Sequence, residues 1–178
     1  MVTAIPNSED AILSLCDYAA PLFERALNAK TIVELGVGQG LSTQVFLHAC
    51  SKTGGHLYSV DIVDCPKARL AVANLRLEKF WTFTIVDDVQ YAVLWHQPID
   101  LLFIDSSHTL EHTLAELNLY SKFVKEDGII LMHDTVNREY HGVIEAIKAF
   151  QKDSSGWQFT ELLPNTIDGL GELKRRSS

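Results

Sequence analysis

Two acids and a histidine in this sequence have the types and spacing for metal or proton chemistry. The apolar run 101–104 is followed directly by Asp105, with His108 three residues later, and a second apolar run ends on Asp134. If the two runs pair as neighbouring strands, the two carboxylates should lie roughly 5 Å apart. Such carboxylates repel unless one holds a proton or a cation such as Mg²⁺ lies between them. Local capping by each acid is the alternative.

A second histidine, His133, directly precedes Asp134. Neighbouring residues of a strand point to opposite faces, so His133 is expected either as a buried structural residue or as a site residue. The second role requires that the strand has already ended, so that His133 can turn into the site as a ligand or base. His112, one helical turn after His108, is expected at the rim of the site or in solvent.

A glycine-rich turn supplies a candidate ligand loop. Gly36, Gly38 and Gly40 follow one apolar run and precede a helical segment that contains Ser42. Glycines allow a tight turn and a close approach of a ligand to the backbone, and the start of the helix favours negative charge. Asp61 ends the next apolar run, where a carboxylate suits the two hydroxyls of a ribose.

The spacing of the glycines separates two classes of cofactor. A dinucleotide fingerprint has a third glycine where this chain has Leu41. Glu34, two residues before the first glycine, is expected to face the same pocket, where it would repel a pyrophosphate and suit a cation. The ligand is therefore predicted to be a nucleoside that carries positive charge, and a nicotinamide oxidoreductase is disfavoured.

The elements that must position these residues can be read from the apolar pattern. Nearly continuous apolar runs alternate with segments of helical spacing, which predicts an α/β fold with a doubly wound, mostly parallel sheet. The last two runs flank a turn sequence and predict a closing antiparallel hairpin. The predicted strands are 31–36, 57–62, 83–87, 99–105, 128–134, 157–163 and 169–175. In such a sheet, ligands bind beyond the carboxyl ends of the strands.

Helical spacing predicts three further features. Residues 8–29 form an N-terminal helical segment that Pro21 should split in two. Leu110, Leu114, Leu117 and Val124 should share one face of a helix that ends at 126–128. Val143, Ile147 and Phe150 mark the next helix. We find no linker, so residues 1–178 are expected to form a single domain.

Composition excludes several classes. The net charge of −8 argues against a nucleic-acid groove, which needs a basic face. Three cysteines without a CxxC pair suit reduced thiols in the cytoplasm. Residues 1–10 lack the features of a secretory signal, and no apolar stretch approaches the ~20 residues that span a membrane. A soluble cytoplasmic protein is expected.

The motifs VELGVGQGLST and YSVDI resemble the cofactor site of class I S-adenosylmethionine-dependent methyltransferases, over about residues 31–176. The resemblance implies a seven-stranded sheet whose last two strands reverse direction. It implies that Asp61 holds the ribose, while Ile62, which could equally be core, packs on the adenine. For Asp88, a helix N-cap and an adenine contact are both open. The implied contacts are Glu34, Gly36, Gly38, Gly40 and Ser42 on the methionine side, Asp88 and Val89 at the adenine, and Asp105 as a further cofactor contact.

The stretches FIDSSH and LMHDT resemble the metal-dependent small-molecule O-methyltransferases, closest to an antibiotic-tailoring branch. The resemblance implies that Asp105 and Asp134 hold Mg²⁺ and that His108 takes the proton from a hydroxyl. A histidine titrates near neutral pH and suits this role. The catechol type has an Asn after its second acid, where this chain has Thr135; Asn137 or Glu139 could substitute.

The predicted activity is methyl transfer from S-adenosylmethionine to a small-molecule hydroxyl. Three alternatives stay open: a methyltransferase that needs no metal and uses His108 or His133 alone, a nicotinamide enzyme, and a cofactor-binding protein that transfers no methyl group. Few residues are available to wall the acceptor pocket, so a second subunit could complete it and a homo-oligomer is one expectation.

Overall fold

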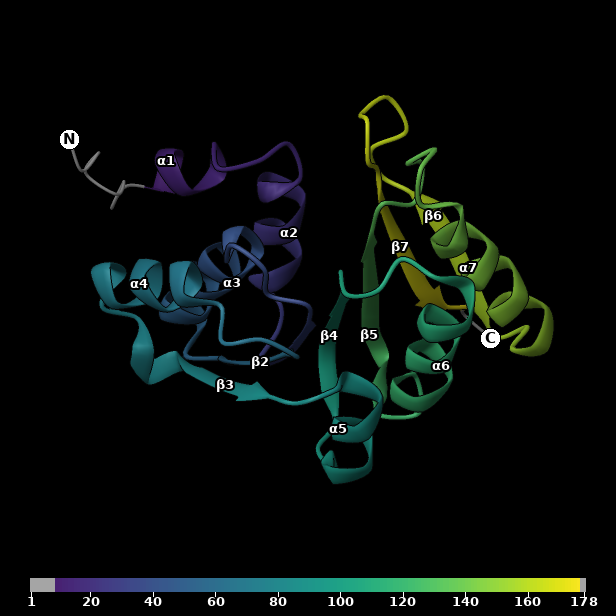
Figure 1. Ribbon diagram of the computed structural model, residues 1–178, viewed down its shortest axis with the longest axis horizontal. Helices are drawn as coiled ribbons and strands as arrows, with labels where there is room; N and C mark the ends of the chain where they lie inside the picture. Colours follow the sequence, from purple (N-terminus) through teal and green to yellow (C-terminus); the bar gives the residue numbers. More distant parts are fainter. Residues whose placement is uncertain (1–8, 177–178) are drawn as a thin grey trace.

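The computed structural model describes residues 9–176 and shows a seven-stranded sheet covered by helices on both faces (Figure 1). The elements are α1 (Glu9–Leu13), α2 (Ala19–Ala26), β1 (Thr31–Leu35), α3 (Leu41–Thr53), β2 (His56–Asp61), α4 (Pro66–Leu75), η1 (Glu78–Phe80), β3 (Trp81–Ile85), α5 (Asp88–Leu94), β4 (Ile99–Ile104), α6 (Leu110–Tyr120), β5 (Val124–His133), α7 (His141–Asp153), β6 (Trp157–Glu161) and β7 (Leu170–Arg175). The strand order is β3-β2-β1-β4-β5-β7-β6, and the β5–β7 and β7–β6 pairs are antiparallel whereas the other four pairs are parallel. The predicted doubly wound sheet with a closing hairpin is confirmed.

Both faces of the sheet are buried, which explains why the strand sequences do not alternate with polar residues. In β4, Leu101 and Phe103 pack with α2 and α3 on one face. Leu102 and Ile104 pack with α6 and α7 on the other face. Figure 1 shows these two groups of helices on opposite sides of the central strands. The apolar runs therefore report burial on two faces, as expected of parallel strands.

The carboxyl ends of β1 and β4 lie side by side at the centre of the sheet. The two strands pair in parallel, with Leu35 opposite Ile104. After β1 the chain crosses to the α3 face, and after β4 it crosses to the α6 face. This reversal opens a crevice between Gly36 and Asp105, which is where open α/β sheets bind ligands.

The N-terminal helical segment is broken at a different place than predicted. Residues 14–18 form turns between α1 and α2, and Pro21 lies in the first turn of α2. A proline is tolerated there because the first amides of a helix have no intrahelical acceptor. The predicted break at Pro21 is therefore wrong, and the predicted start at residue 8 lies outside the described residues.

The assignment of Val124 to a helix is also wrong. Helix α6 ends at Tyr120, and Val124 begins β5, opposite Ile99. The strand register shifts after this pair, and a Cβ on Gly128 would lie 3.0 Å from the Ile99 carbonyl oxygen. Val124 is buried because its side chain reaches the core from strand β5. Its spacing from Leu110, Leu114 and Leu117 also fits one face of a helix, which explains the wrong assignment.

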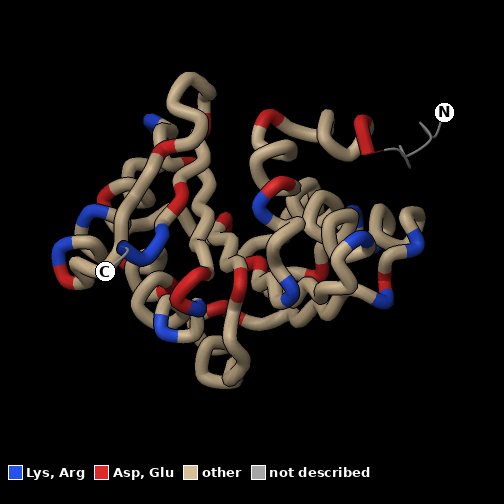
Figure 2. The backbone as a smooth tube through the Cα atoms, turned by 180° about the vertical axis from the view of Figure 1, so that it is seen from behind, with Lys and Arg blue, Asp and Glu red and all other residues tan. Residues whose placement is uncertain are grey.

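Positively charged residues are spread over the described part of the chain. Figure 2 shows Lys and Arg on both flanks of the molecule, interspersed with Asp and Glu. Within residues 9–176, no helix is long and apolar enough to cross a membrane.

Candidate active site

The three glycines of the loop after β1 have different surroundings. Gly36 has φ +89°, and a Cβ there would lie 2.0 Å from the Asp105 carbonyl oxygen, so only glycine lets β1 and β4 end this close together. A Cβ on Gly40 would lie 2.6 Å from the Ala68 Cβ. Gly38 has open space where its Cβ would be. Gly38 is therefore the glycine whose backbone is free to meet a ligand.

Asp61, at the end of β2, holds this loop in place. Its carboxylate accepts hydrogen bonds from the backbone amides of Val37 at 2.9 Å, Gly38 at 3.1 Å and Val63 at 3.0 Å. Burial alone would raise the pKa of Asp61, but these donors outweigh it and lower the pKa. The carboxylate therefore stays ionised and partly exposed at the cavity, where it can also accept from a hydroxyl.

Glu34 lies beneath the loop and does not face the cavity as expected. The side chain is fully buried, and its oxygens accept hydrogen bonds from Ser42 at 2.6 Å, Thr43 at 2.9 Å and Ser59 at 2.6 Å. Burial raises the pKa of Glu34 to about 7, even though the three hydroxyls oppose the shift. The prediction that Glu34 faces the cavity is therefore wrong, and Glu34 ties the loop and α3 to β1 and β2.

A cavity of about 590 Å³ opens at the crevice and continues into a smaller hollow of about 320 Å³. Several predicted cofactor residues line the two hollows. Those in the 590 Å³ cavity are Gly36, Gly38, Asp61, Ile62, Asp88 and Asp105, and those in the 320 Å³ hollow are Gly38, Ser42 and Asp105. Ile62 is 71% exposed, so it is available to pack on a ligand and is not core. Gly40 and Val89 line neither hollow. The combined size falls in the range of cofactor sites.

The acid that caps α5 is Asp87, and the predicted cap at Asp88 is wrong. The Asp87 side chain accepts a hydrogen bond from the backbone amide of Gln90 at 2.9 Å. Asp88 instead points inward, and its Oδ1 lies 2.7 Å from Nε2 of His112. Of the two expectations for His112, free exposure to solvent is wrong because Asp88 engages the ring, whereas a place at the rim agrees with its lining of the 590 Å³ cavity.

Asp105, His108, His133 and Asp134 come together at the ends of β4 and β5. The pairing of Ile104 with Met132 places Asp105 level with His133, so the two acids are not opposite each other as predicted. They still meet, because Asp134 has left the strand with φ 59°. Asp134 Oδ2 lies 2.9 Å from His108 Nε2 and 2.8 Å from His133 Nδ1.

The register of β4 and β5, which places His133 level with Asp105, decides between the two roles open to His133. His133 is still part of β5 and pairs with Leu170, so the expected earlier end of the strand is wrong, yet its ring lies beside Asp134 and has its Nδ1 3.5 Å from Asp105 Oδ1. The interpretation of His133 as a buried structural residue away from the site is thus wrong. Asp105, His108 and Asp134 each offer a ligand atom, and these atoms lie within 4.8 Å of one another. The two carboxylates at this spacing fit a divalent cation, with the His108 imidazole beside it.

Charge in this cluster is balanced between the acids and the histidines. Contacts with the Asp105 and Asp134 carboxylates raise the pKa of His108 to about 9. Burial would lower the pKa of His133, but the same carboxylates outweigh it and raise the pKa to about 10. Burial would raise the pKa of Asp134, whereas the two imidazoles lower it well below its usual range. In this arrangement both histidines hold their protons at neutral pH, and neither can accept another.

Thr135 does not occupy the ligand position that the catechol type suggests. It is buried, and its hydroxyl donates to Glu161 Oε2 at 2.5 Å. The Asn137 amide nitrogen instead donates to Asp134 Oδ1 at 2.7 Å and to Asp168 Oδ1 at 2.8 Å. Asn137 therefore orients Asp134 with its nitrogen, and its oxygen accepts from the Glu139 amide at 2.9 Å.

Sequence reasoning missed three residues around the cluster. The Tyr18 and His133 ring centroids are 4.4 Å apart, and Tyr140 stacks on His108 at 4.2 Å. Asp168 reaches the site from the turn of the closing hairpin. That turn could have been placed from the sequence, because a strand antiparallel to β5 must begin where β5 ends. No pattern in the sequence points to the two tyrosines.

A second cavity, of about 910 Å³, opens on the other side of the cluster. It is lined by His133 and Asp134, by residues 136–140 after β5, and by the hairpin turn around Asp168. It shares no lining residue with the 590 Å³ cavity. The acid–histidine cluster therefore stands at the border between two separate cavities.

Comparison with known proteins identifies the fold and family. No curated protein matches the chain. Among solved structures, SAH-bound methyltransferase PaMTH1 from Podospora anserina is 14% identical, with 96% of this chain and 83% of that chain covered and a TM-score of 0.74. The SAH complex of an O-methyltransferase from Bacillus cereus is 18% identical, with 98% and 84% covered and a TM-score of 0.70. The SAM complex of TomG from Streptomyces achromogenes, an O-methyltransferase involved in tomaymycin synthesis, is 12% identical, with 89% and 79% covered and a TM-score of 0.71.

At these identities the solved structures establish the fold. A family model described as a methyltransferase domain matches residues 33–135, which is more than half of the chain and includes the glycine loop, Asp61, Asp105 and Asp134. The chain therefore belongs to the methyltransferase-domain family and is a class I S-adenosylmethionine-dependent methyltransferase.

Proposed function

We propose that this methyltransferase methylates a hydroxyl group of a small molecule with the help of a divalent metal ion. The observation that carries the proposal is the position of the acid–histidine cluster between two cavities that share no lining residue. S-adenosylmethionine would fill the cavity at the glycine loop, and the acceptor would enter through the 910 Å³ cavity. In-line transfer needs the acceptor oxygen close to the methyl group and opposite the sulfur, which suits this arrangement.

Asp105 and Asp134 would hold the ion, with His108 beside it. An ion there supplies Lewis acidity, which lowers the pKa of a bound hydroxyl. His108 would take the proton of the acceptor. This role requires that His108 first lose its own proton, since its contacts with the two acids raise its pKa to about 9. Positive charge next to the same carboxylates favours that loss.

The surroundings of the second cavity support a small acceptor. Tyr140 and Ile167 line it and are exposed, while Asp134 and Asp168 supply acids at its inner end. A net charge of −8 with dispersed Lys and Arg (Figure 2) is unlike the basic surface that a nucleic-acid substrate needs. A hydroxylated small molecule with an apolar part fits this lining.

Transfer of radiolabelled methyl groups from S-adenosylmethionine to a panel of catechols, phenols and sugars, with Mg²⁺ or with a chelator, tests the proposal. We expect labelled product only with the metal, loss of product in His108→Ala and Asp134→Asn, and retained cofactor binding in both. His141→Ala, which replaces an exposed histidine at the start of α7, is the matched control. Full activity of His108→Ala, or equal turnover with the chelator, would refute the assigned roles.

A further inference from the structure

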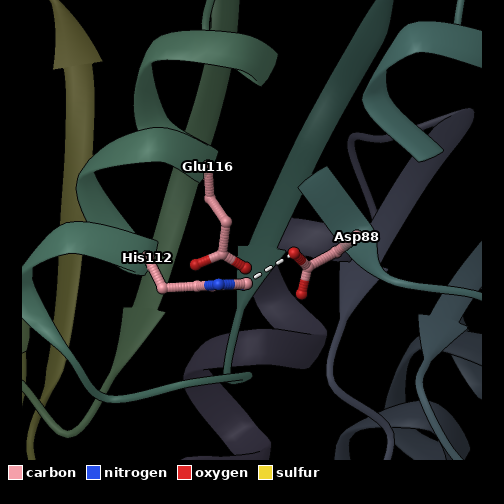
Figure 3. Close-up of side chains that lie close together, drawn as sticks. All are labelled: Asp88, His112 and Glu116. Carbon is pink, nitrogen blue, oxygen red and sulfur yellow. Dashed lines mark hydrogen bonds and ion pairs between the residues drawn. The ribbon is translucent and has the colours of Figure 1, made fainter. Parts of the chain in front are cut away.

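A second group of ligating side chains lies outside the acid–histidine cluster. Asp88 from the start of α5 and His112 and Glu116 from α6 point toward one spot (Figure 3). One ligating atom from each of the three lies within 4.8 Å of the other two. His112 and Glu116 are four residues apart, so they lie on the same face of the helix. The convergence involves two elements and does not come from helical spacing alone.

The group is buried and leaves one oxygen without a partner. Asp88 is 6% exposed and Glu116 is fully buried. Ser106 donates to Glu116 Oε1 at 2.5 Å, but Glu116 Oε2 has no hydrogen-bond partner among the described residues. A buried carboxylate oxygen without a partner is costly, and a neighbouring carboxylate adds repulsion. The arrangement therefore calls for positive charge at this oxygen.

That charge can come from a proton or from a cation. Burial, and next the Asp88 carboxylate, raise the pKa of Glu116 well above its usual range, so a proton is held if nothing else is bound. The group is reachable by an ion, because Asp88, Ser106 and His112 line the 590 Å³ cavity. The His112 side chain is 27% exposed, which leaves space for water on that side.

We infer that Asp88, His112 and Glu116 bind a divalent transition-metal ion in the wall of the cofactor cavity. One imidazole nitrogen and two carboxylate oxygens suit Mn²⁺ or Zn²⁺, whereas Mg²⁺ prefers an all-oxygen shell with several waters. The ion occupies the place of the Glu116 proton and meets the unpartnered oxygen. It ties the start of α5 to α6, and its role is structural.

Counting bound Mn²⁺ by electron paramagnetic resonance separates this site from the one proposed at Asp134. The starting protein is Asp134→Asn, which lacks a ligand of the other cluster but keeps this group intact. We expect Asp134→Asn to retain one Mn²⁺ site, and the added substitution His112→Ala or Glu116→Gln to weaken that site at least ~100-fold, since even a ligand's supporting partner accounts for 10–100-fold. Glu111→Gln, an exposed acid on the same helix, is the matched control and should bind as Asp134→Asn does.

Loss of binding in Glu116→Gln could reflect a folding defect, since Glu116 is in the core. His112 is only half-buried, so His112→Ala gives an independent measurement, and circular dichroism checks both. Paramagnetic broadening locates the ion directly: substoichiometric Mn²⁺ should broaden the amide signals of residues 88, 112 and 116 in Asp134→Asn. Unbroadened signals there, or unchanged Mn²⁺ binding in His112→Ala, would overturn the inference in favour of a carboxyl pair that shares a proton.

Discussion

Replacing Glu34 by Gln should change how the stability of the protein depends on pH. Glu34 is fully buried, and its folded-state pKa is about 7 compared with the ordinary 4.5. Between these values the folded state holds a proton that the unfolded state has lost, so wild-type stability falls as pH rises. The pKa difference, at about 1.4 kcal/mol per pH unit, corresponds to about 3 kcal/mol when the transition is complete. Between pH 5 and pH 8 the loss should be roughly 2–3 kcal/mol.

The glutamine side chain in Glu34→Gln has no carboxyl proton to lose, and its amide can still bond with Ser42, Thr43 and Ser59, whose hydroxyls can donate or accept. The free energy of unfolding of Glu34→Gln, relative to wild type, should therefore rise by roughly 2–3 kcal/mol from pH 5 to pH 8. Urea unfolding followed by fluorescence of the three tryptophans measures it at each pH.

Subtracting one protein from the other removes the contributions of all other titrating groups. Glu24→Gln, which changes an exposed carboxyl on α2, controls for the loss of a charge and should follow wild type. The difference in free energy of unfolding between wild type and Glu34→Gln could instead change by less than about 0.5 kcal/mol from pH 5 to pH 8. In that case burial does not raise the pKa of Glu34, and the explanation is refuted.

Three further outcomes test the local geometry. Gly36→Ala should destabilise the protein by several kcal/mol, because the new Cβ would lie 2.0 Å from backbone. Gly38→Ala has open space around the new Cβ, so it should lower stability by only about 1–2 kcal/mol, through its positive φ. Thermal unfolding of the two variants compares these losses. Asp61→Asn should weaken S-adenosylmethionine binding by about 10- to 100-fold in calorimetry, since a charged acceptor is lost, and unchanged affinity would remove Asp61 from the cofactor site. Thr135→Val should lower stability by about 1–3 kcal/mol, because Glu161 loses a donor, yet leave Mg²⁺ affinity unchanged; weaker Mg²⁺ binding would restore Thr135 as a ligand.

The sheet could be predicted from the sequence because burial on both faces leaves a direct mark in the apolar runs. The turn chemistry between 163 and 169 likewise predicted the closing hairpin. Val124 was misassigned because its spacing from Leu117 fits a helix, while its pairing with Ile99 depends on a distant strand. Long-range pairing of this kind has no local signature.

The site was predictable in its residue types and less so in its geometry. Asp105 and Asp134 could be identified because both follow buried strands. Their relative position depends on the register of β4 and β5 and on the left-handed conformation of Asp134, which sequence does not specify for a non-glycine residue. Glu34 was misplaced for a similar reason, since the three hydroxyls that surround it come from β2 and α3 and meet only in the fold.

The two cavities are built from separate stretches of the chain. Every residue that lines the 590 Å³ cavity comes before residue 113, and every residue that lines the 910 Å³ cavity comes after residue 132. Substitutions in the later stretch, including the turn of the hairpin, can therefore accumulate during evolution while the earlier stretch is conserved by selection. A gene that recombined between residues 113 and 132 would exchange one cavity and inherit the other whole. The two cavities can thus change separately, although the stretches that build them are held together by the pairing of β4 with β5.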